Sequence, residues 1–320
     1  MKRPRLLITR PLPAAVHERA GALFDLTIRK DAGATTAAEL SAALRDHDAI
    51  LPSLGDVFSP AVFADGALPR CRILANFGAG VSHIDLAAAA RAGIAVTNTP
   101  GAVTGPTADL AMLLLLMTAR RAGEGERLVR SGAWKGWHPV QLLGRDVSGS
   151  TIGIVGMGRI GQEVARRAAA GFGMRVLFHN RSPKTVSGMD ATQVPLDDLL
   201  QRADFVVLTV PGGSETRHLI DERAFALMRP EAHLVNVSRG EVVDEVALIR
   251  ALECRQIAGA ALDVYEFEPA VPAALRERDD VVLLPHLGSA TQAARAAMGM
   301  TALDNLEAFF RGDAPENRVA

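Results

Sequence analysis

The stretch TIGIVGMGRIGQEVARR, residues 151–167, decides the fold. Gly156, Gly158 and Gly161 form the pattern G-x-G-x-x-G, which follows the apolar run 151–155 and opens an amphipathic stretch. A strand, a glycine-rich turn and a helix in this order are typical of a dinucleotide-binding unit, whereas the glycines alone would be a weak signal. The local sequence therefore predicts a site for a dinucleotide.

Each position of this turn has its own physical role. Gly156 permits the tight turn, Gly158 lets the backbone approach a pyrophosphate, and Gly161 lets the helix pack closely on the strand. Arg159 and Ile160 begin the helix, whose free N–H groups and partial positive charge favour a phosphate. The structural alternative is an ordinary glycine-rich turn between a strand and a helix.

Short apolar runs alternate with helical patterns on both sides of this stretch. Strand-like runs of the second half lie at 151–155, 175–178, 205–209, 233–237, 257–260 and 281–284. Those of the first half lie at 5–9, 49–51, 72–75 and 95–98, with helical patterns at 36–45 and 84–92. Such alternation predicts parallel α/β layers, and six strands match a full dinucleotide-binding domain.

The 320 residues are enough for two domains. The segment 104–131 has the pattern of one long helix, kinked near Gly123 and Gly125, that separates the two alternating halves. The helical segment 290–311 follows the completed second sheet, and we expect it to pack back on the first domain. The first domain is then built from both ends of the chain.

Composition excludes several classes of function. The net charge of -1 is unlike that of a general nucleic-acid binder. Two cysteines, Cys71 and Cys254, cannot form a disulfide framework or a multi-cysteine zinc site, and we expect no metal. The N-terminus lacks the apolar stretch of a signal peptide, and the most apolar run, 110–117, is short of the about 20 residues that a membrane span needs. We therefore expect a cytoplasmic protein with no membrane or nucleic-acid partner.

The residues after the second strand of the glycine motif bear on the cofactor. An NAD enzyme usually offers an acidic residue there to the ribose 2′-OH. Here the strand 175–178 is followed by His179, Asn180, Arg181 and Ser182, with no acid. Arg181 can pair with a 2′-phosphate, and Asn180 and Ser182 can add hydrogen bonds. This favours NADPH over NADH, with a solvated surface arginine as the alternative.

Three polar residues near the ends of predicted strands are candidates for binding or catalysis. Arg239 follows the run 233–237 and His286 follows the run 281–284, so both lie at strand ends where ligands bind. A guanidinium binds carboxylate and carbonyl oxygens through parallel hydrogen bonds, and an imidazole suits a general acid. Glu268 is the natural partner of the histidine, because an adjacent carboxylate favours the imidazolium form. Taken singly, each residue is also typical of a solvated charge or a structural histidine.

Six stretches carry a resemblance to a known family. They are NFGAGVSHIDL (76–86), GIAVTNTPGAVTGPTADLAMLLLL (93–116), GIVGMGRIGQEVARR (153–167), NVSRGEVVDEVAL (236–248), ALDVYEFEP (261–269) and LPHLGSAT (284–291). Over essentially its whole length the chain resembles the D-isomer-specific 2-hydroxyacid dehydrogenases. Within them it is most similar to the glyoxylate/hydroxypyruvate reductases, because of PTADLAM (106–112), RSGAWKGW (130–137) and the missing acid.

The resemblance implies an α/β fold of two Rossmann-like, doubly wound parallel-sheet domains with a cleft between them. Residues 1–101 plus 288–320 would form a flavodoxin-like, substrate-binding domain. Residues 102–287 would form the dinucleotide-binding domain and include a long helical region through which two copies form a homodimer.

The same resemblance implies roles for individual residues. Arg239, Glu268 and His286 occupy the family's catalytic positions, and Ala79 and Gly80 would hold the substrate carboxylate with their N–H groups. Trp137, rather than Trp134, is the better candidate to reach the partner subunit's substrate site, with plain packing as the alternative. Further cofactor contacts would come from Thr107, Val210, Pro211, Asp263 and Gly288.

The implied activity is reduction of glyoxylate and hydroxypyruvate to D-2-hydroxy acids by hydride transfer from NADPH. A 2-ketogluconate reductase or a phosphoglycerate dehydrogenase of the same family is the close alternative. Only Arg70 and Arg72 are basic within 52–83, which disfavours a phosphorylated substrate. A non-catalytic NAD(H)-sensing protein would be expected to have lost part of the catalytic set, and this chain retains it.

Overall fold

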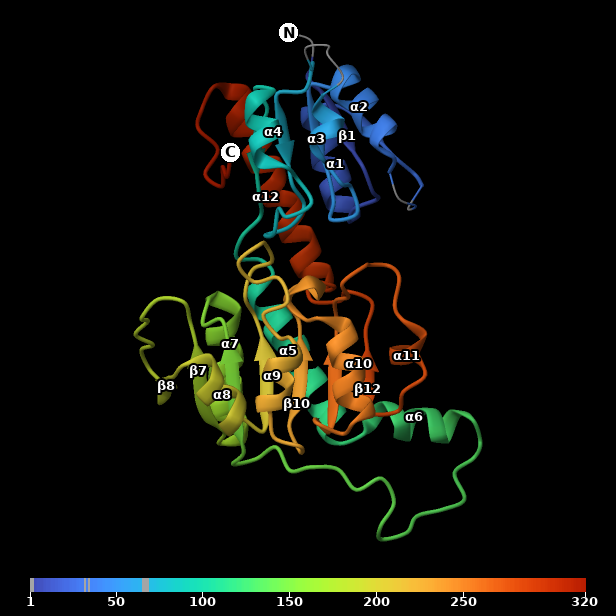
Figure 1. The fold of residues 1–320 in the computed structure, drawn as a ribbon. Helices are drawn as coiled ribbons and strands as arrows, with labels where there is room; N and C mark the ends of the chain where they lie inside the picture. The colour runs from blue at the N-terminus through green and yellow to red at the C-terminus, as the bar shows by residue number, and fades with distance from the viewer. Residues whose placement is uncertain (1–2, 32, 34, 65–68) are drawn as a thin grey trace. The chain divides into compact units, whose positions relative to one another are not determined.

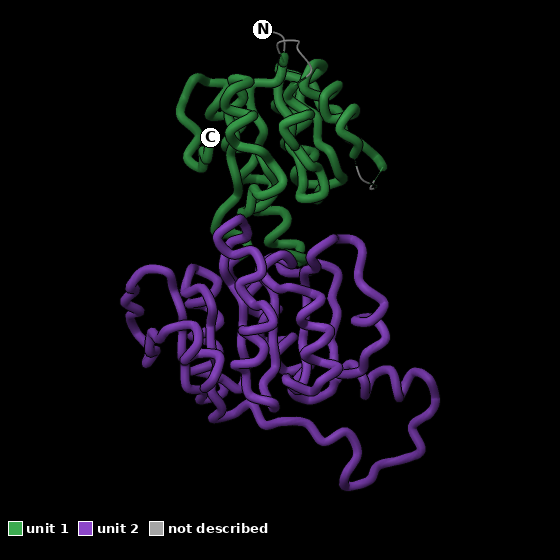
Figure 2. The backbone as a smooth tube through the Cα atoms, in the orientation of Figure 1, with its two compact units in different colours: residues 1–103, 289–320 green, residues 104–288 purple. Residues whose placement is uncertain are grey.

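In the computed structural model the chain forms two compact units, which Figure 2 colours separately. Unit 1 comprises residues 1–103 and 289–320, and unit 2 comprises residues 104–288. The structure describes residues 3–31, 33, 35–64 and 69–320.

Unit 1 is a parallel α/β sheet flanked by helices (Figure 1). Its strands are β1 (Arg5–Ile8), β2 (Asp25–Ile28), β3 (Ala49–Leu51), β4 (Ile73–Ala75) and β5 (Ala95–Thr97). Its helices are α1 (Ala14–Leu23), α2 (Ala37–Asp46), α3 (Pro60–Phe63), α4 (Leu86–Arg91) and α12 (Gln292–Arg311). The order β2-β1-β3-β4-β5, with every pairing parallel, is that of flavodoxin-like sheets.

Helices cover both faces of this sheet because its strands are buried on both sides. Leu51 belongs to one apolar cluster with side chains of α1 and α12, whereas its neighbour Ile50 belongs to a second cluster with α2, α3 and α4. Alternate residues of a strand point to opposite faces, so this division places the two helical layers on opposite sides.

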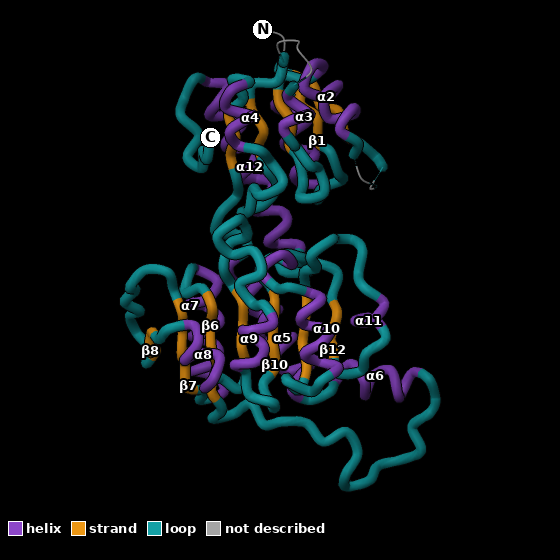
Figure 3. Tube along the Cα trace, in the orientation of Figure 1, coloured by secondary structure: helices purple, strands orange, loops and turns teal. Residues whose placement is uncertain are grey.

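Unit 2 has the larger sheet, which Figure 3 shows as strands between helices. Its strands are β6 (Thr151–Val155), β7 (Arg175–His179), β8 (Ala191–Gln193), β9 (Phe205–Leu208), β10 (His233–Asn236), β11 (Gly259–Leu262) and β12 (Val281–Leu283). Its helices are α5 (Thr104–Ala119), α6 (Ala122–Arg130), α7 (Arg159–Phe172), α8 (Leu196–Arg202), α9 (Glu222–Leu227), α10 (Glu245–Glu253) and α11 (Ala273–Arg276), with a 3₁₀ turn η1 (Gly240–Val242).

The strand order of unit 2 reverses beside the glycine motif. The order is β12-β11-β10-β9-β6-β7-β8, and the chain starts at β6, runs outward through β7 and β8, and then returns to β9 on the other side. Ligands of such sheets bind at this switch point, outside the carboxyl ends of the strands. Side chains of α5 and α7 share one apolar cluster with alternate strand residues, and those of α8, α9 and α10 share the other. Two doubly wound parallel sheets confirm the predicted fold class.

Three details differ from the sequence-based expectation. Two edge strands, β2 and β8, had no predicted counterpart, because both are short and partly exposed and lack a continuous apolar run. The predicted strand 257–260 begins two residues too early, since β11 starts at Gly259. The long helix breaks before the predicted glycine kink: α5 ends at Ala119, and Arg121 has a left-handed φ of 51°.

Within the described parts of the chain, no helix is both long and apolar enough to cross a membrane.

Candidate functional site

The glycine turn of unit 2 has the shape that a dinucleotide needs. Gly156 has a φ of +100°, which side chains rarely tolerate. A Cβ at Gly161 would lie 2.2 Å from the carbonyl oxygen of Gly156, so only glycine allows α7 to start this close to β6. A Cβ at Gly158 would meet no described atom within 4 Å, which leaves its backbone open.

The first turn of α7 supplies donors for a phosphate. Gly158 precedes the helix, and no side chain caps it. The N–H groups at the start of an uncapped helix have no intrahelical partner, and they attract anions together with the helix dipole. Arg159 and Ile160 are the first residues of this helix. The turn and the helix start therefore fit the pyrophosphate of a dinucleotide.

The residues after β7 form a turn beside the glycine motif. Asn180 accepts a hydrogen bond from the N–H of Met157 at 3.3 Å and donates to the carbonyl of Ser182 at 3.2 Å. Arg181 is exposed and forms an ion pair with Glu215, a residue of the loop after β9. Asn180, Arg181 and Ser182 thus lie together at the edge where the sequence predicts the ribose.

The segment after β9 lies on the other side of the glycine turn. A Cβ at Gly156 would approach the N atom of Val210 to 2.9 Å, and Thr209 donates its hydroxyl to the carbonyl of Gly156 at 2.6 Å. The carbonyl of Pro211 accepts the hydroxyl of Thr216 at 2.7 Å. Val210 and Pro211 therefore begin a turn that runs back towards Arg181.

Arg239 lies three residues after the end of β10 and immediately precedes η1. Its backbone carbonyl accepts a hydrogen bond from the Asn236 amide at 3.0 Å, and its guanidinium donates to the Ser238 carbonyl at 2.6 Å. Burial lowers the pKa of this guanidinium, and the carboxylates of Glu268 and Glu241 oppose that effect. A guanidinium in this half-buried position can bind a substrate carboxylate as a further anionic partner.

The backbone around Arg239 is fixed by a close contact. A Cβ at Gly240 would overlap the carbonyl group of Tyr265 at 1.8–1.9 Å, so the segment after β10 packs directly on the segment that carries Glu268. The N–H of Tyr265 in turn donates to Oε1 of Glu268 at 3.0 Å.

His286 and Glu268 form a hydrogen-bonded pair. Nδ1 of His286 lies 2.9 Å from Oε2 of Glu268, and the two side chains are 29% and 33% exposed. Burial raises the pKa of Glu268, but the hydrogen bond and charge of His286, the Tyr265 N–H and Arg239 outweigh it and hold that pKa below its usual value. The carboxylate is therefore ionised, and it leaves Nε2 as the ring nitrogen available to a substrate.

Asp263 organises the backbone around His286. The N–H of His286 donates to the backbone carbonyl of Asp263 at 2.9 Å. The N–H groups of Leu287 and Gly288 donate to the Asp263 carboxylate at 2.6 and 2.8 Å. Burial of this side chain, which is 1% exposed, raises its pKa, and the two N–H groups partly offset the effect. The hydroxyl of Thr107 donates to the Gly288 carbonyl at 3.0 Å. His286 has a φ of +55°, an uncommon value that these contacts maintain.

Ala79 and Gly80 lie in unit 1, on the turn after β4. The side-chain amide of Asn76 donates to the carbonyls of Gly78 and Gly80, each at 2.9 Å, and that of Asn98 donates to the carbonyl of Ala79 at 2.7 Å. Among the described residues, the N–H groups of Ala79 and Gly80 have no hydrogen-bond acceptor. A turn with fixed carbonyls and free N–H groups is suited to an anion.

The segment that carries the tryptophans extends from the body of unit 2 (Figure 1). None of the residues of α6 is buried. In the segment after it, Trp137 is 80% exposed, and Trp134 donates its indole N–H to Gln141 at 3.3 Å. Neither tryptophan packs into the core of its own chain.

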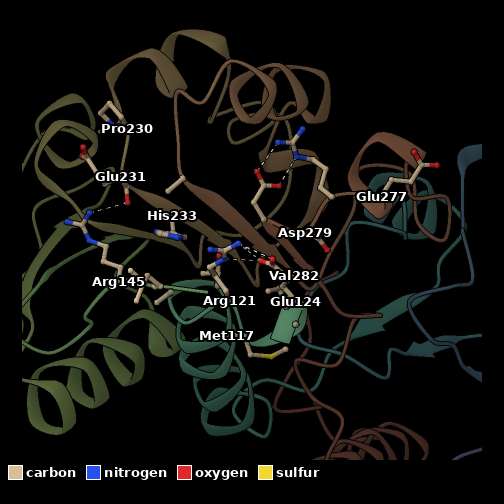
Figure 4. A pocket seen from close by; sticks show the side chains of 18 residues that line it. Met117, Arg121, Glu124, Arg145, Pro230, Glu231, His233, Glu277, Asp279 and Val282 are labelled. Atoms are coloured by element: carbon tan, nitrogen blue, oxygen red, sulfur yellow. Dashed lines mark hydrogen bonds and ion pairs between the residues drawn. The ribbon is translucent and has the colours of Figure 1, made fainter. Parts of the chain in front are cut away.

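A cavity of about 840 Å³ lies at the opposite edge of the unit 2 sheet (Figure 4). His233 at the start of β10 lines it, and burial lowers the pKa of this histidine to about 4. Four of the charged side chains that line the cavity form two ion pairs, Arg121 with Glu124 and Arg278 with Asp280. Because it lies at the amino ends of the strands, it is separate from Arg239 and His286.

The structure adds charged residues that the sequence reasoning missed. The sequence offers no reason to select Glu215 as a site residue, because it is simply an acidic residue in the turn after a predicted strand. In unit 1, the buried carboxylate of Asp56 binds Arg10 at 3.1 Å and the hydroxyl of Thr35 at 2.6 Å. Arg10 thus lies beside the segment 52–56 and is a further basic residue near the position where a substrate phosphate would need one. Asp56 already neutralises the charge of Arg10.

Comparisons with known proteins agree with this geometry. Residues 112–288 match the family model described as D-isomer specific 2-hydroxyacid dehydrogenase, NAD binding domain. A glyoxylate reductase of Thermococcus onnurineus is 45% identical over 99% of this chain and 96% of its own length, and one of Pyrococcus horikoshii is 44% identical over the same shares. The crystal structure of an NADPH-dependent glyoxylate/hydroxypyruvate reductase from Sinorhizobium meliloti, in complex with NADP and malonate, is 37% identical. It has a TM-score of 0.87 and covers 100% of this chain and 97% of its own. The chain thus belongs to the D-isomer-specific 2-hydroxyacid dehydrogenases, and it is an NAD(P)-dependent oxidoreductase.

Proposed function

We propose that the protein reduces glyoxylate and hydroxypyruvate to D-2-hydroxy acids and that it prefers NADPH to NADH. The observation that carries the proposal is the pair formed by His286 Nδ1 and Glu268 Oε2 at 2.9 Å, together with the half-buried Arg239 after a neighbouring strand. These side chains supply a proton donor and an anion-binding group, which reduction of a 2-keto acid requires. The cytoplasmic location expected from the sequence remains an expectation.

Arg239 and His286 have separate roles in this proposal. The guanidinium of Arg239 binds the substrate carboxylate and polarises the keto oxygen through parallel hydrogen bonds. Nε2 of His286 donates its proton to that oxygen as negative charge develops, and Glu268 stabilises the imidazolium before the transfer. The free N–H groups of Ala79 and Gly80 are proposed to bind the carboxylate as well.

The cofactor would be held by residues of unit 2. The backbone at Gly156, Gly158 and Gly161 and the first turn of α7 would bind its pyrophosphate. Asn180, Arg181 and Ser182 would face the adenosine ribose, and Thr107, Val210, Pro211, Asp263 and Gly288 would complete the contacts. When bound, the cofactor supplies the hydride for the carbonyl carbon.

A substrate screen tests the proposal. Initial rates are measured with glyoxylate, hydroxypyruvate, pyruvate, 2-ketogluconate and phosphohydroxypyruvate, each with NADPH and with NADH. We expect the highest kcat/KM for glyoxylate or hydroxypyruvate with NADPH. A clear preference for 2-ketogluconate or for the phosphorylated acid would replace the proposed substrate, and no turnover of any acid would favour a binding protein.

Arg181→Ala is expected to lower kcat/KM for NADPH by about 10–100-fold, because a hydrogen bond to a charged group contributes about 1.5–3 kcal/mol. The value for NADH should remain nearly unchanged, since NADH has no 2′-phosphate. Steady-state kinetics with both cofactors at saturating keto acid measure the effect. A parent enzyme that uses NADH as well as NADPH, or equal losses for both cofactors, would contradict the cofactor assignment.

Asn180→Asp is the complementary variant. The aspartate keeps the oxygen that accepts the Met157 N–H and introduces the carboxylate that NAD enzymes offer to a ribose 2′-OH. It should shift the preference towards NADH.

We also propose that the arm formed by α6 and residues 131–143 contacts a second copy of the chain. Large apolar side chains are exposed along it: Val129, Trp134, Trp137, Val140 and Leu143. Such a concentration on one segment is typical of an interface, and most homo-oligomers are symmetric dimers. In this proposal Trp137 reaches the substrate site of the second copy.

Trp137→Ser combined with Val140→Ser is expected to weaken the dimer by about 10³-fold, because each lost apolar contact occurs twice in a symmetric interface. Sedimentation velocity over a range of concentrations measures the dissociation constant. Val246→Ser is the control, since Val246 is also an exposed valine but lies on α10, outside the arm. A parent protein that sediments as a monomer at micromolar concentration would exclude the dimer.

A further inference from the structure

We infer that Glu215 limits the preference for NADPH by holding Arg181 and opposing a 2′-phosphate at that position. This inference rests on the proposed role of Arg181 in NADPH binding and goes beyond it. Glu215 carries the one carboxylate that the structure pairs with Arg181 among the described residues.

The two residues meet across the end of β6. In the sheet β6 lies between β7 and β9, and it leads into the glycine turn. Arg181 follows β7 on one side, and Glu215 belongs to the loop after β9 on the other. Their ion pair therefore joins the two segments that flank the switch point, which is where such sheets bind the adenosine part of a dinucleotide.

Local hydrogen bonds fix the turn that carries Arg181. The side chain of Gln193, on β8, donates to the carbonyls of Asn180 and Ser182 at 3.2 and 3.1 Å. Its amide oxygen accepts the N–H of Lys184 at 2.8 Å. The backbone on both sides of Arg181 is thus tied to a strand.

The turn that carries Glu215 is fixed in the same way. The N–H of Gly213 donates to the Glu241 carboxylate at 2.8 Å, and the N–H of Arg217 donates to the Gly213 carbonyl at 3.0 Å. The hydroxyl of Thr216 donates to the Pro211 carbonyl at 2.7 Å. Because the backbone of both turns is fixed, the fold keeps the side chains of Glu215 and Arg181 within reach of each other.

The charges at this point decide how the pair acts on a ligand. Both side chains are well exposed, 83% for Arg181 and 73% for Glu215, so a ligand can reach them and break the pair at modest cost. A 2′-phosphate has to displace the Glu215 carboxylate from the Arg181 guanidinium or share the guanidinium with it. The phosphate and the carboxylate are both anions and repel each other. A ribose with a free 2′-OH carries no such charge. Glu215 therefore lowers the affinity for NADPH more than that for NADH. It also places beside the ribose a carboxylate, the group that NAD enzymes usually carry after the strand that corresponds to β7.

Glu215→Gln tests the inference, because the amide keeps the size of the side chain and removes its charge. The probes are adenosine 2′,5′-bisphosphate and 5′-AMP, which differ in the 2′-phosphate and need neither a nicotinamide nor a keto acid. Isothermal titration calorimetry should show adenosine 2′,5′-bisphosphate binding about fivefold more tightly than to the parent, the upper range for an exposed ion pair. Binding of 5′-AMP should change by less than twofold. Glu253→Gln, at the far end of α10, is the control for loss of one negative charge.

A double-mutant cycle with Arg181→Ala completes the test. If Glu215 acts by holding Arg181, then Glu215→Gln should have a clearly smaller effect in the Arg181→Ala background. The inference is overturned if Arg181→Ala weakens the bisphosphate while Glu215→Gln leaves it within twofold of the parent. If Arg181→Ala itself has no effect on the bisphosphate, the proposed cofactor contact fails and this inference fails with it.

Discussion

His286→Ala is expected to lower kcat for glyoxylate reduction by about 10²–10⁴-fold, the range that general acid catalysis contributes. The imidazole is the group whose Nδ1 is bound to Glu268 and whose Nε2 remains available to the keto oxygen. Alanine leaves water as the only proton donor, so the loss should fall on kcat. The measurement is steady-state kinetics at saturating NADPH.

NADPH binding should change little in this variant, which separates loss of chemistry from loss of structure. His47→Ala is a suitable control, because His47 is a partly buried histidine of unit 1 whose ring contacts the Ala43 carbonyl at 3.3 Å. A His286→Ala enzyme with near-normal kcat would mean that another group donates the proton. Loss of NADPH binding together with kcat would instead point to a structural role.

The parts of the fold that the sequence predicts well are those with strong local signals. Strand β6 has the predicted bounds and helix α7 begins at the predicted Arg159, because the turn requires glycine and the strand is apolar on both faces. Strand β2 was missed because it is an edge strand of alternating polarity, and β11 was shifted because the apolar run around it extends beyond the strand at its start. The break between α5 and α6 occurs at Arg120 and Arg121, where no glycine or proline indicates it.

The candidate site divides in a similar way. The sequence could indicate His286 and Glu268 because each lies in a recognisable segment near a strand end, and the structure brings the two into contact. Their catalytic roles remain predictions. The sequence could not indicate that Glu215 reaches Arg181, because the two residues belong to separate loops whose meeting depends on the strand order around β6. Nor does any local pattern show that the Asp263 carboxylate accepts the N–H groups beside His286.

Arg239→Lys is expected to lower kcat/KM for glyoxylate by about 100-fold or more, through a lower kcat and a higher KM. Lysine keeps the positive charge but replaces a planar fork of donors by a single ammonium group. Each charge-assisted hydrogen bond that is lost contributes about 1.5–3 kcal/mol, so loss of parallel geometry to a carboxylate and a carbonyl accounts for this range. The measurement is kcat and KM for glyoxylate with saturating NADPH.

The surroundings of Arg239 make the substitution a specific test of this geometry. The aliphatic part of Arg239 packs against Gly212: a Cβ at Gly212 would lie 3.3 Å from Cβ and 2.8 Å from Cγ of Arg239. The next residue, Gly240, packs on the Tyr265 backbone. A lysine retains these aliphatic contacts, so the fold and NADPH binding should be preserved. Arg250→Lys, on the exposed surface of α10, is the matched control and should behave as the parent. If Arg239→Lys matches the parent for glyoxylate, the half-buried guanidinium serves the structure of the segment after β10. The substrate carboxylate must then be bound by other donors, of which the N–H groups of Ala79 and Gly80 are the first to test.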